Sequence, residues 1–117
     1  MHIQLNTNEG IKGDERMVET VEAEIMDALS HFQDHISSVD VYLSDANKTK
    51  HGADDKICVI EARPNGKPPI AASHQAESIQ EALTVAAEKM QHRLEHNFGK
   101  QNHHKGGDTV RRGFDAS

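Results

Sequence analysis

The sequence predicts an α+β fold, a two-layer sandwich in which two helices cover one face of a four-stranded sheet. Four short segments alternate apolar and polar residues with the period of two of a half-buried strand, and two longer segments carry apolar residues at the three- and four-residue steps of a helix. Their order along the chain is β-α-β-β-β-α, and 117 residues suit a single core of this kind. We expect one α+β domain over residues 1–99 and a flexible polar tail over residues 100–117.

The first strand and the first helix follow from this spacing. Ile3 and Leu5 alternate with polar residues, and glycines then end the alternation. Asp14 is placed to cap a helix that we expect to continue to about His35, because a side-chain oxygen there accepts hydrogen bonds from free backbone N–H groups. The apolar residues of this helix share one face and are Val18, Val21, Ile25, Leu29 and Phe32.

Three more strands follow as a meander. The third has apolar residues on both sides, so the sequence leaves its buried face open, and Gly66 can take the positive φ of the turn that joins it to the fourth. A strand, a crossover helix and a second strand favour a right-handed parallel unit, so we expect the first strand beside the second, whereas the later links favour antiparallel pairing. The expected strands cover about 39–44, 56–63 and 69–74, with a polar loop over 45–55.

The second helix begins with a capping box. Ser78 and Glu81 have the spacing at which a hydroxyl and a carboxylate each accept from an unpaired backbone N–H group. We expect the helix to end at Gly99, because the residues beyond it are too polar to offset the entropy lost on ordering. Its apolar stripe consists of Ile79, Leu83, Ala86, Met90, Leu94 and Phe98.

Composition excludes several classes of protein. Cys58 is the only cysteine, so no intrachain disulfide forms, and its aliphatic neighbours predict a buried thiol of low reactivity. No apolar run approaches the roughly 20 residues of a membrane span, and the opening residues are not a signal peptide, so we expect a cytoplasmic protein without a membrane partner. Phosphate-binding loops, nucleophile elbows and metalloprotease motifs are absent from the sequence. We therefore expect no enzyme, no cofactor and no small-molecule substrate.

Charge is unevenly distributed along the chain. The net charge of −6 argues against a general nucleic-acid binder, but any polyanion should meet the C-terminal part first. The first helix segment sets seven carboxylates against Arg16: Asp14, Glu15, Glu19, Glu22, Glu24, Asp27 and Asp34. The C-terminal part sets Glu95 and Asp108 against six cations: Lys89, Arg93, Lys100, Lys105, Arg111 and Arg112.

Five segments stand out when taken with the element order: Phe32–Ile36 (FQDHI), Val39–Asp45 (VDVYLSD), Asp54–Lys56 (DDK), Glu61–Pro64 (EARP) and Ala86–Met90 (AAEKM). Together they resemble the ribosome hibernation promoting factor family, which includes ribosome-associated inhibitor and sigma modulation proteins. The similarity covers roughly residues 1–100 and is spread over many positions. We expect a short-type member, because residues 100–117 are too few for the dimerisation domain of the long type, and we favour a monomer.

The resemblance implies a cytosolic stress-response protein that binds rRNA of the small ribosomal subunit. Such proteins occlude the channel of messenger and transfer RNA, inhibit translation without catalysis and preserve idle ribosomes. The family carries lysines on its first helix where this chain has Glu24, Ala28 and His31, so either this face points away from RNA or the chain binds something else. The candidate RNA-binding residues are Lys89, Arg93 and Lys100, with His92, His96, Arg63 and Lys67 as further members.

Three alternatives stay open. Cations at the end of the second helix can simply complement the helix dipole. His92 and His96, one turn apart, could hold a metal ion with Glu95, His103 or His104, but no cysteine or carboxylate spacing completes a zinc site, so we expect no metal. Near the ordinary histidine pKa of about 6.5, the cluster of His92, His96, His103 and His104 could instead gain positive charge as the cell acidifies. The acidic first helix could instead dock a basic protein, giving an interaction module of the same fold without ribosome binding.

Overall fold

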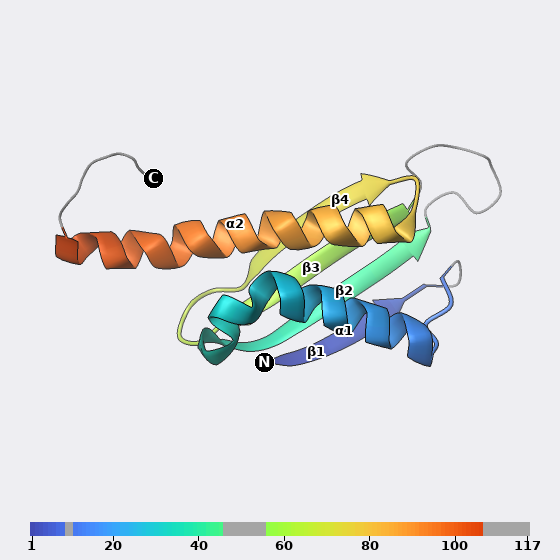
Figure 1. The fold of residues 1–117 in the computed structure, drawn as a ribbon, viewed down its shortest axis with the longest axis horizontal. Helices are drawn as coiled ribbons and strands as arrows, with labels where there is room; N and C mark the ends of the chain where they lie inside the picture. The colour runs from blue at the N-terminus through green and yellow to red at the C-terminus, as the bar shows by residue number, and fades with distance from the viewer. Residues whose placement is uncertain (9–10, 46–55, 107–117) are drawn as a thin grey trace.

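A computed structural model describes residues 1–8, 11–45 and 56–106, with only the backbone of residues 99–106 (Figure 1). Its element order, β-α-β-β-β-α with one short 3₁₀ segment, confirms the predicted fold class. The elements are β1 (His2–Thr7), α1 (Glu15–Leu29), the 3₁₀ segment η1 (Ser30–His35), β2 (Ile36–Asp45), β3 (Lys56–Pro64), β4 (Ile70–Ala76) and α2 (Ile79–Gly106).

The four strands form one mixed sheet in the order β1-β2-β3-β4. β1 pairs in parallel with β2, with Ile3 opposite Val39, and the other neighbours are antiparallel. The crossover from β1 to β2 runs through α1, which is the connection that a parallel pair requires. The prediction that the first strand lies beside the second is therefore confirmed, and β1 and β4 are the two edges.

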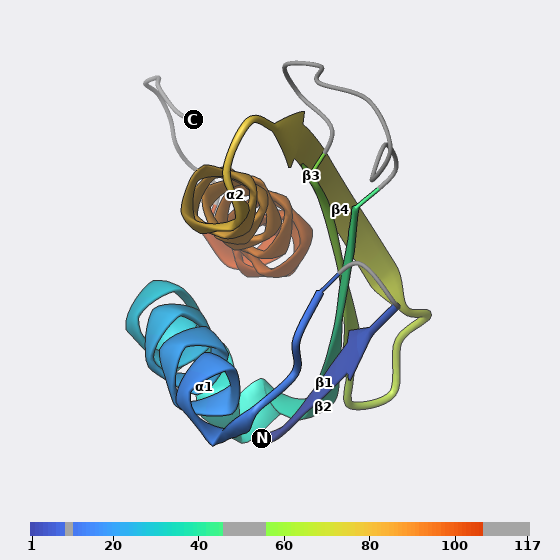
Figure 2. The same ribbon diagram turned by 90° about the vertical axis from the view of Figure 1, so that its right-hand side faces the viewer.

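Both helices lie on the same face of the sheet and run in the same direction (Figures 1 and 2). α1 lies over the β1 and β2 side, and α2 lies over β3 and β4, with which it makes most of its sheet contacts. The core between the layers consists of the inward residues of the strands and one stripe from each helix. Its largest members are Val21, Ile25, Leu29, Ile36, Val39, Val41, Leu43, Cys58, Ile60, Leu83, Met90 and Leu94.

The third strand resolves the question that the sequence left open. Cys58, Ile60 and Ala62 are fully buried under the helices, whereas Ile57 and Val59 lie half-buried on the other face. Burial raises the pKa of the Cys58 thiol to about 12, because the thiolate loses its hydration there. The thiol is therefore protonated and packed as a small apolar group, as predicted.

α1 ends earlier than predicted. Asp14 caps it, since its Oδ1 accepts from the Met17 N–H at 3.0 Å, but the α-helix stops at Leu29 and the chain tightens into η1 up to His35. η1 has no fully buried residue, and Phe32 is its one large apolar side chain. Without a continuous buried stripe, little favours α-helical over 3₁₀ geometry at this end.

α2 begins as predicted and continues further than predicted. The Ser78 Oγ accepts from the Glu81 N–H at 3.1 Å, and the preceding hairpin turns at Gly66 with φ +73°. The helix passes through Gly99, where the sequence had predicted its end, and extends to Gly106. One glycine costs a helix only about 1 kcal/mol, so it does not by itself force an end. The expected disorder of the final residues, and the expected loop after β2, concern segments outside the described residues.

Within the described part of the chain, every helix is too short or too polar to pass through a lipid bilayer.

Candidate nucleic-acid interface

One exposed face of α2 gathers four of the predicted RNA-binding side chains. Lys89, His92, Arg93 and His96 follow one another at steps of three, one and three residues, so they form a continuous row along the helix. All four are exposed, whereas Met90 and Leu94, which face the sheet, are fully buried. The buried stripe therefore fixes the direction of the row, which we call the basic row.

Among the described residues, no carboxylate forms an ion pair with a cation of the basic row. The Lys89 Nζ donates to the Ser73 backbone oxygen of β4 at 3.0 Å and lies 3.3 Å from the His74 Nδ1. Arg93 makes no ion pair with any described residue. The acidic side chains of α2 recur at seven-residue spacing as Glu81, Glu88 and Glu95, and Glu88 and Glu95 lie one turn before and one turn after His92.

Two further predicted residues lie near the C-terminal half of α2. Lys100 follows His96 by one turn of the helix, and its side chain lies outside the described residues. Lys67, at the tip of the β3–β4 hairpin, holds its Nζ 4.8 Å from the centre of the Phe98 ring. Phe98 in turn stacks on Phe32 of η1 with ring centres 5.5 Å apart, so this ammonium group sits on an aromatic cluster.

Arg63 is separated from the other predicted residues. It alternates with the buried Ala62 and therefore lies on the face of the sheet that the helices leave open. Its Nε lies 3.9 Å from the Asp40 Oδ2 and its Nη2 lies 3.4 Å from the Glu61 Oε1. A guanidinium paired with two carboxylates on the opposite face adds little to the field around the basic row.

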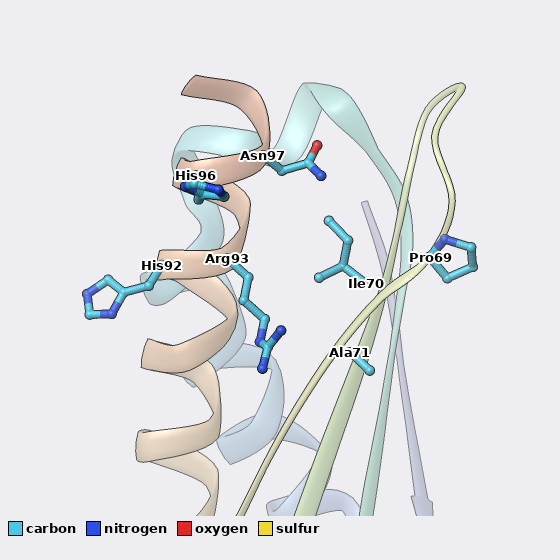
Figure 3. A pocket seen from close by; sticks show the side chains of 7 residues that line it. All are labelled: Pro69, Ile70, Ala71, His92, Arg93, His96 and Asn97. Atoms are coloured by element: carbon cyan, nitrogen blue, oxygen red, sulfur yellow. The ribbon is translucent and has the colours of Figure 1, made fainter. Parts of the chain in front are cut away.

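A groove beside the basic row was not predicted from the sequence. It has a volume of about 530 Å³ and lies between α2 and the start of β4, the edge strand (Figure 3). The sequence does contain one feature that could have indicated the groove. The polar residue Asn97 lies near the apolar stripe of the helix, three residues after the buried Leu94. The lining residues are Pro69, Ile70, Ala71, His92, Arg93, His96 and Asn97.

The surface of α1 is acidic, as predicted. Glu15, Glu19, Glu22 and Asp27 are exposed, and Arg16 is the one cation of this helix. The described residues contain no group of three histidine, cysteine or carboxylate side chains arranged to hold a metal ion. His92 and His96 therefore stand as two exposed imidazoles without a third ligand among those residues.

Comparison with known proteins finds one family and a shared fold. Residues 6–102 match the family described as Sigma 54 modulation protein / S30EA ribosomal protein. The N-terminal domain of Thermus thermophilus Protein Y is 16% identical, with a TM-score of 0.67 over 83% of this chain and 99% of that one. A ribosomal subunit interface protein from Coxiella burnetii is 20% identical, with a TM-score of 0.65 over 85% of this chain and 99% of that one. None of the curated proteins matches the sequence.

Proposed function

The chain belongs to the Sigma 54 modulation protein / S30EA ribosomal protein family, and from this membership we propose that it associates with the ribosome and binds rRNA of the small subunit through the basic row. The observation that carries the proposal is the absence of described carboxylate partners around Lys89 and Arg93. Cations without carboxylate partners release counterions from a phosphate backbone, and this release supplies a large share of the affinity for RNA.

The proposed action is steric. A chain bound in the channel of messenger and transfer RNA would exclude both without chemical reaction, which agrees with the absence of catalytic motifs from the sequence. The firm packing of α2 on β3 and β4 supports this action, because a rigid element presents its cations without further loss of entropy. We therefore propose a translation inhibitor that acts by occupancy in the cytoplasm.

Sedimentation of the full chain with purified small ribosomal subunits at low salt tests the proposal. We expect the wild type to pellet with the subunits and the double variant Lys89→Glu, Arg93→Glu to remain in the supernatant, with unchanged circular dichroism because both side chains are exposed. The sedimentation is carried out at about pH 7.5 and at about pH 6, on either side of neutrality. Wild-type protein that stays in the supernatant at both pH values would refute ribosome binding.

The acidic surface of α1 favours a second candidate function, docking of a basic protein. Its exposed carboxylates face away from the sheet and oppose any phosphate. Charge reversal by Glu22→Lys, Glu24→Lys and Asp27→Lys should abolish this mode, whereas it should preserve or improve binding to ribosomal subunits. A pull-down of protein partners that is unchanged by this triple variant would exclude the second function.

A further inference from the structure

The groove between α2 and β4 combines features of a small-ligand site. It is an open groove whose volume of about 530 Å³ is similar to the roughly 300–1,000 Å³ of small-ligand sites. Pro69 and Ile70 form an apolar wall on the strand side. Figure 3 shows Arg93 and Asn97 reaching from α2 toward that wall, whereas His92 points away from it.

Asn97 carries the most specific signal in the groove. Its Oδ1 is buried and has no hydrogen-bond partner among the described residues, and within that part of the chain it is the only such side-chain atom. Buried acceptors are almost always paired in native proteins, so the Asn97 Oδ1 is a hydrogen-bond acceptor that a donor from outside the described residues can satisfy. The required donor is an N–H or O–H group that reaches past the apolar wall.

The charge at the groove selects the class of ligand. Arg93 lines it and lacks a described carboxylate partner, and Lys89 lies one turn earlier in the same row. None of the described residues that line it is acidic. A ligand that joins an anionic group to a flat, partly apolar body with N–H donors matches these three properties, and a nucleotide has all of them.

The edge of β4 is poorly suited to the main alternative, an added protein strand. Lys89 already occupies the Ser73 backbone oxygen at 3.0 Å. Pro69, immediately before the strand, has no N–H group to donate. A lysine and a proline at these positions are the usual devices that prevent pairing at a sheet edge.

We infer that the groove holds one unstacked base of single-stranded RNA, with the Asn97 Oδ1 accepting from a base N–H and Arg93 contacting the adjacent phosphate. The inference rests on the proposed function and deepens it, because it adds a base-binding pocket to a surface otherwise defined by charge. Sequence-specific recognition of RNA commonly uses such unstacked bases, read by hydrogen bonds at their edges.

A double-mutant cycle, with one change in the RNA and one in the protein, tests the inference by fluorescence anisotropy. The probes are a short labelled single-stranded RNA and the same backbone without bases, and the proteins are the full-length wild type and Asn97→Leu. We expect removal of the bases to weaken wild-type binding by about 5- to 100-fold, the range for leaving a buried polar group unpaired, and to weaken the variant far less. Gln91→Leu, an amide change on the same helix outside the groove lining, is the matched control and should retain the wild-type base dependence.

Each outcome decides the inference. Equal base dependence in the wild type and Asn97→Leu would overturn it, and competition for the groove by an extended peptide but not by RNA bases would assign the groove to a protein strand. If Asn97→Leu fails to fold, the side-chain amide signal of Asn97 in the nuclear magnetic resonance spectrum of the wild type decides instead. That signal should shift with the normal RNA and not with the abasic one, and no shift would refute the base contact.

The two proposals fail separately. Small subunits that pellet with the wild type while Asn97→Leu shows unchanged base dependence would leave the proposed function intact and remove the base pocket. Protein that binds short RNA in a base-dependent manner but never pellets with subunits would keep the base pocket and refute ribosome binding.

Discussion

Replacement of Arg93 by glutamine should weaken binding to the small ribosomal subunit and reduce its dependence on salt, whereas the same replacement at Arg63 should change neither. The reason is geometric. Arg93 lies in the basic row without a described carboxylate partner, and Arg63 lies on the open face of the sheet within 3.9 Å of Asp40 and 3.4 Å of Glu61. Both changes remove one positive charge from the same protein, so net charge alone predicts equal effects.

The magnitude follows from counterion release. Each phosphate contact contributes about 0.7 to 0.9 to the slope of log affinity against log salt. When salt rises from about 50 to about 200 mM, the affinity of a protein that lacks one contact should therefore fall by a factor about threefold smaller than that of the wild type. We therefore expect the slope for Arg93→Gln to be smaller by about 0.7 to 0.9 and that for Arg63→Gln to match the wild type. Equilibrium titration of labelled protein with small subunits at four salt concentrations measures both slopes. Equal reductions for the two variants would show that position on the fold does not matter, and would refute the confinement of the interface to α2.

Three further predictions concern the fold. Leu94→Ala should lower the free energy of unfolding by about 2–5 kcal/mol in urea titration, because the side chain is fully buried, whereas the exposed neighbour Glu95→Ala should stay within about 0.5 kcal/mol. Burial raises the pKa of Cys58 from 9.0 to about 12, so the protonated thiol stabilises the fold fully below pH 9. This contribution to the free energy of unfolding should fall by about 1.4 kcal/mol per pH unit as the pH rises from 9 toward 12. Unfolding of Cys58→Val, measured between about pH 8 and about pH 10.5, should lack this slope. Gly66→Ala should cost about 1–2 kcal/mol, since φ is +73°, and an equal stability of the two proteins in urea would contradict the strain.

The architecture could be predicted because burial leaves a periodic trace in the sequence. Val39, Val41 and Leu43 alternate in β2 and are all buried, and the helical stripe through Leu83, Met90 and Leu94 is buried as well. Both periods arise from backbone geometry, which holds in every context. The element order and the parallel first pair then leave few topologies to choose from.

The ends of the helices could not be predicted as well, because small free energies decide them. α1 stops at Leu29 although Phe32 continues its apolar spacing, and α2 passes through Gly99. The choice between an α and a 3₁₀ turn, or the penalty of one glycine, amounts to about 1 kcal/mol or less. Neighbouring elements, such as the Phe98 ring stacked against Phe32, contribute at this scale and are invisible in a local window.

The candidate interface could be predicted where it depends on helix spacing and not where it depends on the sheet. Lys89, His92, Arg93 and His96 lie on one side of α2 because steps of three and four residues connect them. Arg63 could not be assigned to a side while the buried face of β3 was undecided, and its partners Asp40 and Glu61 come from two strands. The groove required the packing of α2 against the β4 edge, which brings Asn97 and Ile70 together from distant parts of the chain.

The division of charge between the two helices bears on how a polyanion can be oriented when it binds. α1 lies over the β1 and β2 side and α2 over the β3 and β4 side, so the carboxylates of α1 and the basic row are on separate parts of one layer (Figure 2). A polyanion that approaches the helical layer is repelled on one side and attracted on the other, which restricts the orientations in which it can bind. A negative net charge is therefore compatible with RNA binding, provided that contact is confined to α2 and the β4 edge. Neutralising the α1 carboxylates should then raise affinity while making the bound orientation less uniform, and a loss of affinity would contradict this arrangement.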